Sequence, residues 1–239
     1  PTTVATATPV SLAYYDGTQG LTGNALKTTL HDIIDNHTAF PYSSSSTDVW
    51  DILRVADADP NNANNVMLFY TGWSRSGPAE YDGGNGWNRE HVWARSHGGF
   101  STSTTPGTDV HMLRPTDVTV NSARGNKDFD EGGSPYIDGD GATGCYSDSD
   151  SWEPRPEVKG DVARILFYMA VRYEGDVSGE PDLELADYTP TSGPFHGDMS
   201  VLLQWHQEDP VDDYERSRNE IIYQDYQTLL SKEIIRPVP

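Results

Sequence analysis

The segment from Glu157 to Glu174 carries the strongest folding pattern in the sequence. Its apolar residues recur at the spacing of one broad helix face, and Pro156 stands just before it, where proline favours a helix start. That face comprises Val158, Val162, Ile165, Leu166, Met169, Ala170 and Tyr173. The longest apolar run in the chain also lies here, and its seven residues fall far short of the roughly 18 that a membrane span requires. We therefore predict a packed helix and no membrane span.

Weaker patterns of the same kind predict the other elements. Apolar residues recur at helical spacing behind Thr22, a typical N-cap residue. The predicted helices cover residues 22–37, 47–55, 157–174 and 214–232, and a predicted strand covers residues 66–73. Because no internal repeat or long linker divides the chain, we predict one α+β domain over residues 1–239, a mixed fold with several helices around a small sheet.

The chain is strongly acidic. It carries 37 Asp and Glu residues against 16 Lys and Arg, which gives a net charge of −21. Such a mean field repels nucleic acid over a Debye length of roughly 8–10 Å, although it does not decide what a single site binds. An acidic surface with few lysines is also typical of a protein adapted to high salt concentrations, so salt tolerance is a further hypothesis. The 6 Trp, 13 Tyr and 6 Phe residues supply enough large apolar surface to exclude a wholly disordered chain.

Residues 84–127 stand out from this acidic background. They contain five of the 16 basic residues but only three acidic ones, so this stretch has a net charge of +2. Three of the seven histidines, His91, His97 and His111, also lie here. A basic, histidine-rich patch on an acidic body is what recognition of a polyanion requires.

Glu90 and His91 form the first candidate pair for chemistry in this stretch. A carboxylate is a hard oxygen ligand suited to Mg²⁺, Mn²⁺ or Ca²⁺, and a neighbouring imidazole can take a proton from water near neutral pH. Adjacent residues of a straight strand point to opposite sides, so joint action requires a bend. The dipeptide by itself leaves open an alternative, in which His91 packs in the core and Glu90 forms a surface ion pair with Arg89.

A second candidate group follows along the chain. Residues 108–115 alternate like a strand that Pro115 ends, and Thr116 is expected to cap a short helix over residues 117–124. One face of that helix carries Asp117, Asn121 and Arg124. A carboxamide oxygen beside a guanidinium suits a metal ligand next to a phosphate clamp. Asparagine is also mildly unfavourable inside a helix, and such choices often mark function.

Three stretches of the sequence resemble motifs of the bacterial endonuclease I family, namely WNREHVWARSHG, TDVHMLRPTDVTVNSARGN and PEVKGDVARILFYMAVRYEG. The members of this family are periplasmic or secreted non-specific nucleases with a ββα-metal (His-Me) finger, and the resemblance spans residues 14–226. It implies a finger at about residues 87–127, metal ligands at Glu90 and Asn121, and a general base at His91. His111 matches a histidine of the second finger strand, for which a supporting role is implied.

The resemblance also implies the reaction. His91 takes a proton from the water that attacks phosphorus, and Mg²⁺ on Glu90 and Asn121 stabilises the phosphate and the leaving 3′-oxygen, with Mn²⁺ or Ca²⁺ as substitutes. The family's products are 5′-phosphate ends from double- and single-stranded DNA and from RNA. Such cleavage needs contacts with the nucleic-acid backbone only.

The phosphate-stabilising arginine of the family lies in a loop of variable length. Arg95 is the nearest candidate, Arg114 and Arg124 are alternatives, and Arg89 and Lys127 are further candidates for substrate binding. Two features depart from the family. Some members carry several disulfides, whereas the single Cys145 excludes any internal one, and the tail after Tyr226 does not match.

Two other functions remain open at this point. His91, His97 and His111 could form a three-histidine zinc site of a hydrolase, although no HExxH motif is present. A secreted calcium- or glycan-binding module without catalysis would use the acidic stretches at residues 57–65 and 138–150. The second stretch lacks the carboxylate that a calcium loop needs at its twelfth position, so a solvated acidic loop is expected there.

Location and assembly follow less directly. The first nine residues have neither a positive region nor an apolar one, so a cytosolic protein and a secreted one whose signal was removed both remain open from composition. The family resemblance implies a secreted or periplasmic protein. A monomer is expected, since no heptad pattern or exposed apolar stripe is seen.

Overall fold

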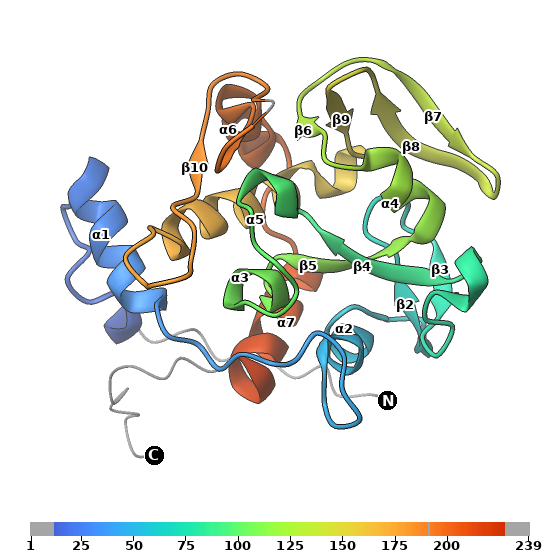
Figure 1. Ribbon diagram of the computed structural model, residues 1–239, viewed down its shortest axis with the longest axis horizontal. Helices are drawn as coiled ribbons and strands as arrows, with labels where there is room; N and C mark the ends of the chain where they lie inside the picture. The colour runs from blue at the N-terminus through green and yellow to red at the C-terminus, as the bar shows by residue number, and fades with distance from the viewer. Residues whose placement is uncertain (1–11, 191, 228–239) are drawn as a thin grey trace.

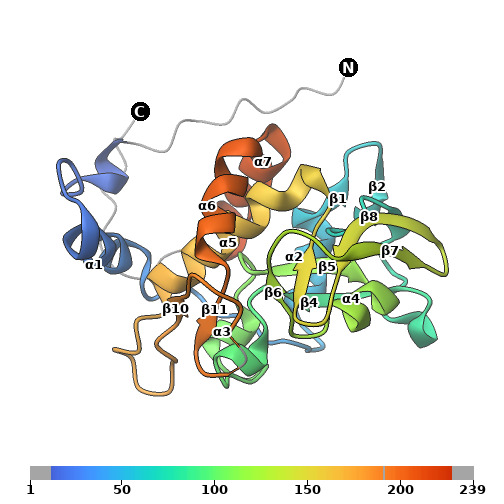
Figure 2. The same cartoon turned by 90° about the horizontal axis from the view of Figure 1, so that it is seen from above.

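The computed structural model describes residues 12–190 and 192–227. Most helices gather in one half of the molecule and most strands in the other (Figure 1), and the view from above shows the same division (Figure 2). The α-helices are α1 Gly23–Ile34, α2 Val49–Ala56, α3 Thr105–Thr108, α4 Val118–Arg124, α5 Lys159–Arg172, α6 Met199–Glu208 and α7 Asp213–Ile221. Shorter turns of helix are η1 Leu12–Tyr15, η2 Asp82–Gly84, η3 Arg95–His97, η4 Pro156–Val158 and η5 Ile222–Tyr226.

The strands form four small sheets rather than one. A three-stranded sheet contains β1 Ala58–Asp59, β2 Asn62–Met67 and β3 Ser74–Ser76. A four-stranded sheet has the order β6 Asp128–Phe129, β9 Ser151–Glu153, β8 Gly141–Ser147 and β7 Ser134–Asp138. The two-stranded sheets pair β4 Trp87–His91 with β5 Leu113–Asp117, and β10 Glu184–Leu185 with β11 Phe195–His196. The mixed α+β class predicted from the sequence is confirmed.

The helix predicted over residues 157–174 is confirmed as the centre of the helical half. Its first residues form η4, and α5 follows directly and packs against α1 and α6. Val162, Leu166, Met169 and Tyr173 are fully buried, because the apolar stripe faces these neighbours. The same core contains four fully buried tryptophans, namely Trp87 of β4, Trp93 just after it, Trp152 of β9 and Trp205 of α6.

Three other predicted helices are confirmed with changes at their ends. Thr22 occupies the N-cap position of α1, although its side chain makes no capping hydrogen bond there. The second helix begins at Val49, because Asp48 forms a capping box with Asp51 and so fixes the start. The third, α7, begins after Asp212, and part of its predicted range, residues 228–232, lies outside the described residues.

Two sequence-based assignments were wrong in detail. The predicted strand over residues 66–73 ends at Met67, because Leu68 and Gly72 close a tight turn in which Gly72 adopts a positive φ of 68°. The stretch expected to be an acidic loop, residues 138–150, contains the turn of the hairpin between β7 and β8 and all of β8. Asp138 and Asp140 lie at its turn, where they contact Thr119 and Arg75.

No helix in residues 12–190 and 192–227 is long and apolar enough to cross a membrane.

Candidate active site

A ββα unit lies at the junction of the helices and the sheets. β4 pairs with β5 in antiparallel register, so that Glu90 lies opposite Arg114, and α4 follows β5 without a loop. Asp117 caps this helix, since its carboxylate accepts the backbone N–H groups of Thr119 and Val120. The cap is therefore Asp117 and not Thr116, the residue expected from the sequence.

The second strand of this unit starts later than its alternation predicted. Residues 109–112 form a turn because the buried Asp109 carboxylate accepts the backbone N–H of His111 and the hydroxyls of Tyr168 and Tyr173. Pro115 lies inside β5 and does not end it. Its carbonyl accepts from the backbone N–H of Phe69, and its missing donor is tolerated because β4 and β5 form a two-stranded sheet.

Helix α4 contacts β4 through two polar pairs. Asn121 Nδ2 donates to Asn88 Oδ1 at 2.7 Å, and Arg124 Nη1 donates to Glu90 Oε1 at 2.9 Å. Asn121 and Arg124 are three residues apart on α4, and Asn88 and Glu90 are two apart on β4. Residues at these spacings share one face of their element, so the two hydrogen-bonded pairs are adjacent. Asn121 and Glu90, the two residues that the family resemblance implies as metal ligands, thus belong to adjacent hydrogen-bonded pairs.

Glu90 is a buried carboxylate, with 2% of its surface exposed. Burial raises its pKa, and the Arg124 guanidinium and the hydroxyl of Tyr70, which donates at 2.8 Å, oppose that rise. Both donors reach the same oxygen, Oε1. The ion pair is with Arg124, not with Arg89 as the alternative interpretation had it.

His91 ends β4 and contacts different partners from those of Glu90. Its Nε2 lies 3.0 Å from the carbonyl of Gly107, which can only accept, so this nitrogen carries the proton and Nδ1 keeps its lone pair. The ring stacks on Tyr42. Burial lowers the pKa of His91 to about 3, so the imidazole is neutral near pH 7.

The candidate arginines lie in very different surroundings. Arg114 and Arg124 are buried, and their guanidinium groups pair with Asp57 and Glu90 respectively, so neither suits a clamp on a substrate phosphate. Arg95 is exposed, on the helical turn η3 just after β4.

The other two basic candidates are held by protein groups. Arg89 is sandwiched between the rings of Tyr42 and Trp50, at 3.4 and 4.1 Å from their centroids, and donates to the Tyr42 carbonyl. Lys127 donates to Ser147 at 2.5 Å.

The three histidines proposed for a zinc site do not come together. His91 faces Gly107, and His97 Nδ1 lies 2.7 Å from the carbonyl of Phe195. His111 packs against Tyr168 of α5, and burial lowers its pKa to about 4. Its contacts are thus with the helical half of the molecule, and it sits in the turn before the second strand.

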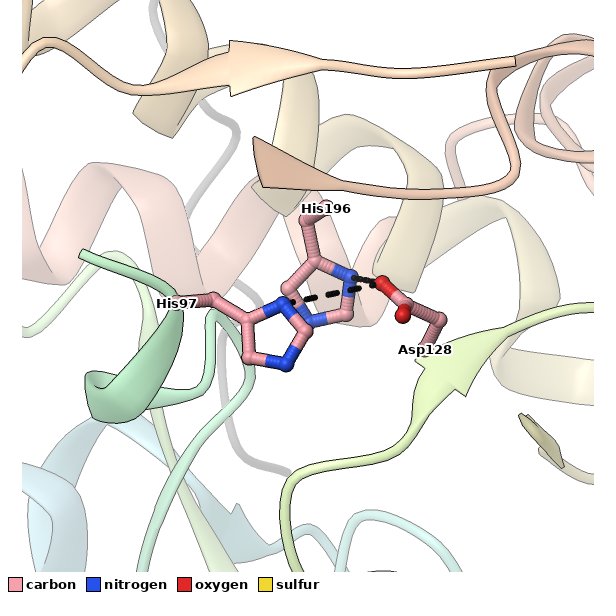
Figure 3. A group of neighbouring side chains, drawn as sticks. All are labelled: His97, Asp128 and His196. Carbon is pink, nitrogen blue, oxygen red and sulfur yellow. Dashed lines mark ion pairs between the residues drawn. The ribbon is translucent and has the colours of Figure 1, made fainter. Parts of the chain in front are cut away.

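His97 instead belongs to a buried group with Asp128 and His196. Figure 3 shows the three side chains converging from η3, β6 and β11. His196 Nδ1 lies 2.8 Å from Asp128 Oδ1, and His97 Nδ1 lies 3.8 Å from the same oxygen. On the far side of its ring, His196 Nε2 lies 3.2 Å from Arg124 Nη2.

Glu90 and Asn121 fit a hard divalent cation. The donors from Tyr70 and Arg124 both end on Glu90 Oε1, so Oε2 is the oxygen that could coordinate. Asn121 donates from its Nδ2 to Asn88, so its Oδ1 is the atom that could coordinate. One carboxylate and one amide oxygen suit Mg²⁺, which keeps several waters.

Sequence reasoning missed four residues of this site. Asn88 and Asp128 stand close to the recognised motifs, but only their contacts show their part. Tyr70 and His196 come from distant segments, and no local pattern marks them. Tertiary structure alone brings them to Glu90 and Arg124.

Comparison with known proteins identifies the family of this chain. Residues 22–228 match the endonuclease I family. The extracellular ribonuclease of Bacillus subtilis (strain 168) is 61% identical over 217 residues, which cover 90% of this chain and 72% of that protein. The extracellular ribonuclease of Bacillus amyloliquefaciens is 58% identical over 215 residues, covering 90% of this chain and 72% of its own length. The chain is thus a phosphodiester-hydrolysing nuclease and belongs to the endonuclease I family.

Proposed function

We infer that this nuclease cleaves both RNA and DNA endonucleolytically, without reading sequence, and leaves 5′-phosphate ends. A divalent cation, Mg²⁺ with Mn²⁺ or Ca²⁺ as substitutes, is held by Glu90 and Asn121. The observation that carries this proposal is the two adjacent hydrogen-bonded pairs between α4 and β4, one containing the Asn121 carboxamide and the other the Glu90 carboxylate. Both are ligands that hard cations prefer.

His91 is the base in this proposal. The Gly107 carbonyl holds the proton on Nε2, so Nδ1 is free to accept one from water. Because burial keeps the ring neutral near pH 7, no proton has to leave before it acts. A bound cation would stabilise the negative charge on the phosphate and the leaving oxygen.

Arg95 is the proposed contact to the substrate phosphate. It is exposed and follows the end of β4 on η3, whereas the buried Arg114 and Arg124 already bind carboxylates. An exposed guanidinium can form two parallel hydrogen bonds with a phosphate. Contacts of this kind position a backbone without distinguishing bases, which suits non-specific cleavage.

Secretion and a monomeric state complete the proposal. The two Bacillus relatives are named extracellular ribonucleases, which supports secretion of this chain and RNA as one of its substrates. DNA as a second substrate rests on the family resemblance.

Replacing Asn121 tests the cation site directly. Asn121→Leu keeps the branched arrangement of heavy atoms but removes the amide oxygen, and it is expected to raise the Mg²⁺ concentration for half-maximal cleavage by about 10- to 100-fold. Asn121→Asp keeps an oxygen ligand and should stay much closer to wild type. The measurement is cleavage of plasmid DNA and of RNA over a Mg²⁺ series, with EDTA abolishing activity.

The matched control is Asn126→Ala, an exposed asparagine in the same segment that contacts Ser96. It should leave the Mg²⁺ requirement unchanged. Equal Mg²⁺ curves for Asn121→Leu and wild type, or full activity in EDTA, would refute the proposed cation site.

Salt should affect this enzyme in two opposing ways. The body carries a net charge of −21, so added salt screens its repulsion from nucleic acid while it also weakens each phosphate contact. The screening length shrinks between about 10 mM and about 1 M NaCl. We therefore expect the cleavage rate to rise first and then fall as NaCl increases over that range. A steady fall from the lowest salt concentration would contradict this expectation.

A further inference from the structure

Arg124 is the best-fixed side chain near the candidate active site. It is fully buried, and its two terminal nitrogens make four hydrogen bonds, to Glu90 Oε1, to the carbonyls of His91 and Val92, and to His196 Nε2. Two terminal nitrogens carry four hydrogens. All four are therefore used, and the orientation of the guanidinium is fully determined by these acceptors.

Three of these acceptors belong to β4 or the residue after it, but the fourth comes from elsewhere. His196 lies on β11, in a segment that Asp128 of β6 holds in place (Figure 3). Asp128 Oδ1 accepts the backbone N–H of Gly197 at 2.8 Å and lies 2.8 Å from His196 Nδ1. His196 is thus fixed between a carboxylate on one side and a guanidinium on the other.

The partners of His196 decide which nitrogen carries its proton. Arginine has donors only, so Nε2 of His196 must accept from Arg124 and cannot carry a proton. The proton is then on Nδ1, which lies 2.8 Å from the Asp128 carboxylate. Burial and the neighbouring Arg124 lower the pKa of His196, which keeps the ring in this neutral form.

The same contacts argue against a metal ion within the group of His97, Asp128 and His196. To bind an ion through Nδ1 while accepting from Arg124 at Nε2, His196 would have to lose both protons. His97 Nδ1 faces the carbonyl of Phe195 at 2.7 Å and so must donate. A metal-bound histidine normally donates its other N–H to a carboxylate or carbonyl, whereas here a cationic donor occupies that place.

We propose that His196, oriented by Asp128, is a positioning residue that holds the Arg124 guanidinium and through it the Glu90 carboxylate. The series runs from Asp128 to His196 at 2.8 Å, to Arg124 at 3.2 Å, and to Glu90 at 2.9 Å. The inference rests on the proposed role of Glu90 as a cation ligand. Groups behind a ligand typically change metal affinity by about 10- to 100-fold when they are replaced.

A matched pair of variants separates the two nitrogens of His196. The Gln side chain of His196→Gln reaches the position of Nε2 and can still accept from Arg124. The shorter side chain of His196→Asn reaches only the position of Nδ1, so it keeps a contact to Asp128 and loses the one to Arg124. We expect His196→Asn to weaken Mn²⁺ binding without substrate, measured by electron paramagnetic resonance, by about tenfold. His196→Gln should stay within about threefold.

Each other outcome counts against the proposal. A role in packing alone would lower the melting temperature of both variants and leave their Mn²⁺ affinities equal. Stoichiometric zinc in the purified wild-type protein, lost in both variants, would establish a metal site in place of the hydrogen-bonded series. Glu90→Gln, measured alongside, tests the ligand itself. If it leaves Mn²⁺ affinity unchanged, the proposed function fails, whereas weak binding to Glu90→Gln with equal His196 variants refutes only the positioning role.

The tautomer of His196 can be measured in wild type, so the test does not depend on either variant folding. A long-range proton–nitrogen NMR spectrum should show His196 with a protonated Nδ1 and a bare Nε2. A protonated Nε2 would overturn the proposal.

Discussion

His91→Gln is expected to lower kcat/KM for RNA and DNA by about 10²- to 10⁴-fold, the usual contribution of a general base. Gln can still donate to the Gly107 carbonyl from the position of Nε2, so the contact that holds the native ring is retained. What disappears is the lone pair at Nδ1. The loss should appear in kcat with little change in KM, measured in initial-rate assays at saturating Mg²⁺.

His206→Gln is the matched control, since His206 is an exposed histidine on α6. It should retain wild-type activity. If His91→Gln also retained activity while its circular dichroism spectrum matched that of wild type, the base would have to be another group. Metal-dependent cleavage by that variant would preserve the nuclease assignment and refute only the role of His91.

Asp57→Asn should produce the largest loss of stability. Asp57 is 1% exposed, and its Oδ1 lies 3.2 Å from Arg114 Nη1 and 2.9 Å from Arg218 Nε. Removing the charge leaves two buried guanidinium groups with less compensation, and breaking a buried pair costs about 3–5 kcal/mol. For a chain of this size that corresponds to a fall in melting temperature of roughly 10 °C, measurable by calorimetry and by urea unfolding.

Asp213→Asn serves as the comparison, because Asp213 is fully exposed and its ion pair with the half-exposed Arg216 should contribute little. A second comparison combines Asp57→Asn with Arg218→Met, which removes one of the charges left behind. The double variant should then lose less stability than the sum of its single changes. A loss below about 1 kcal/mol for Asp57→Asn would show that Asp161, the other partner of Arg114, compensates the network.

The arginines show where sequence reasoning reaches its limit. Arg95, Arg114 and Arg124 are chemically identical in the sequence, and each could clamp a phosphate. The structure separates them by burial, because Arg114 and Arg124 meet carboxylates from other segments and Arg95 does not. Exposure of a charged side chain depends on which distant segment packs over it, and no local pattern records that.

The turn at residues 109–112 is a second example. The alternation there is consistent with a strand, and a strand would have placed His111 in the finger. Asp109 instead binds hydroxyls from Tyr168 and Tyr173 of the central helical segment. A buried carboxylate must find donors, so these long-range hydrogen bonds outweighed the local preference for an extended backbone.

The sequence by itself determined the α5 helix and the mixed fold class. These follow from periodicity, which acts over a few residues along the chain. Glu90, His91 and Asn121 were marked as site candidates by the resemblance of their motifs to the family, and their roles stay proposals. Only the tertiary structure decided that Arg124 fixes Glu90, that Tyr70 and His196 join them, and that the three histidines of the motif region lie apart. The reason is physical: burial removes water from these groups, so each must take its partner from whatever segment the fold brings near.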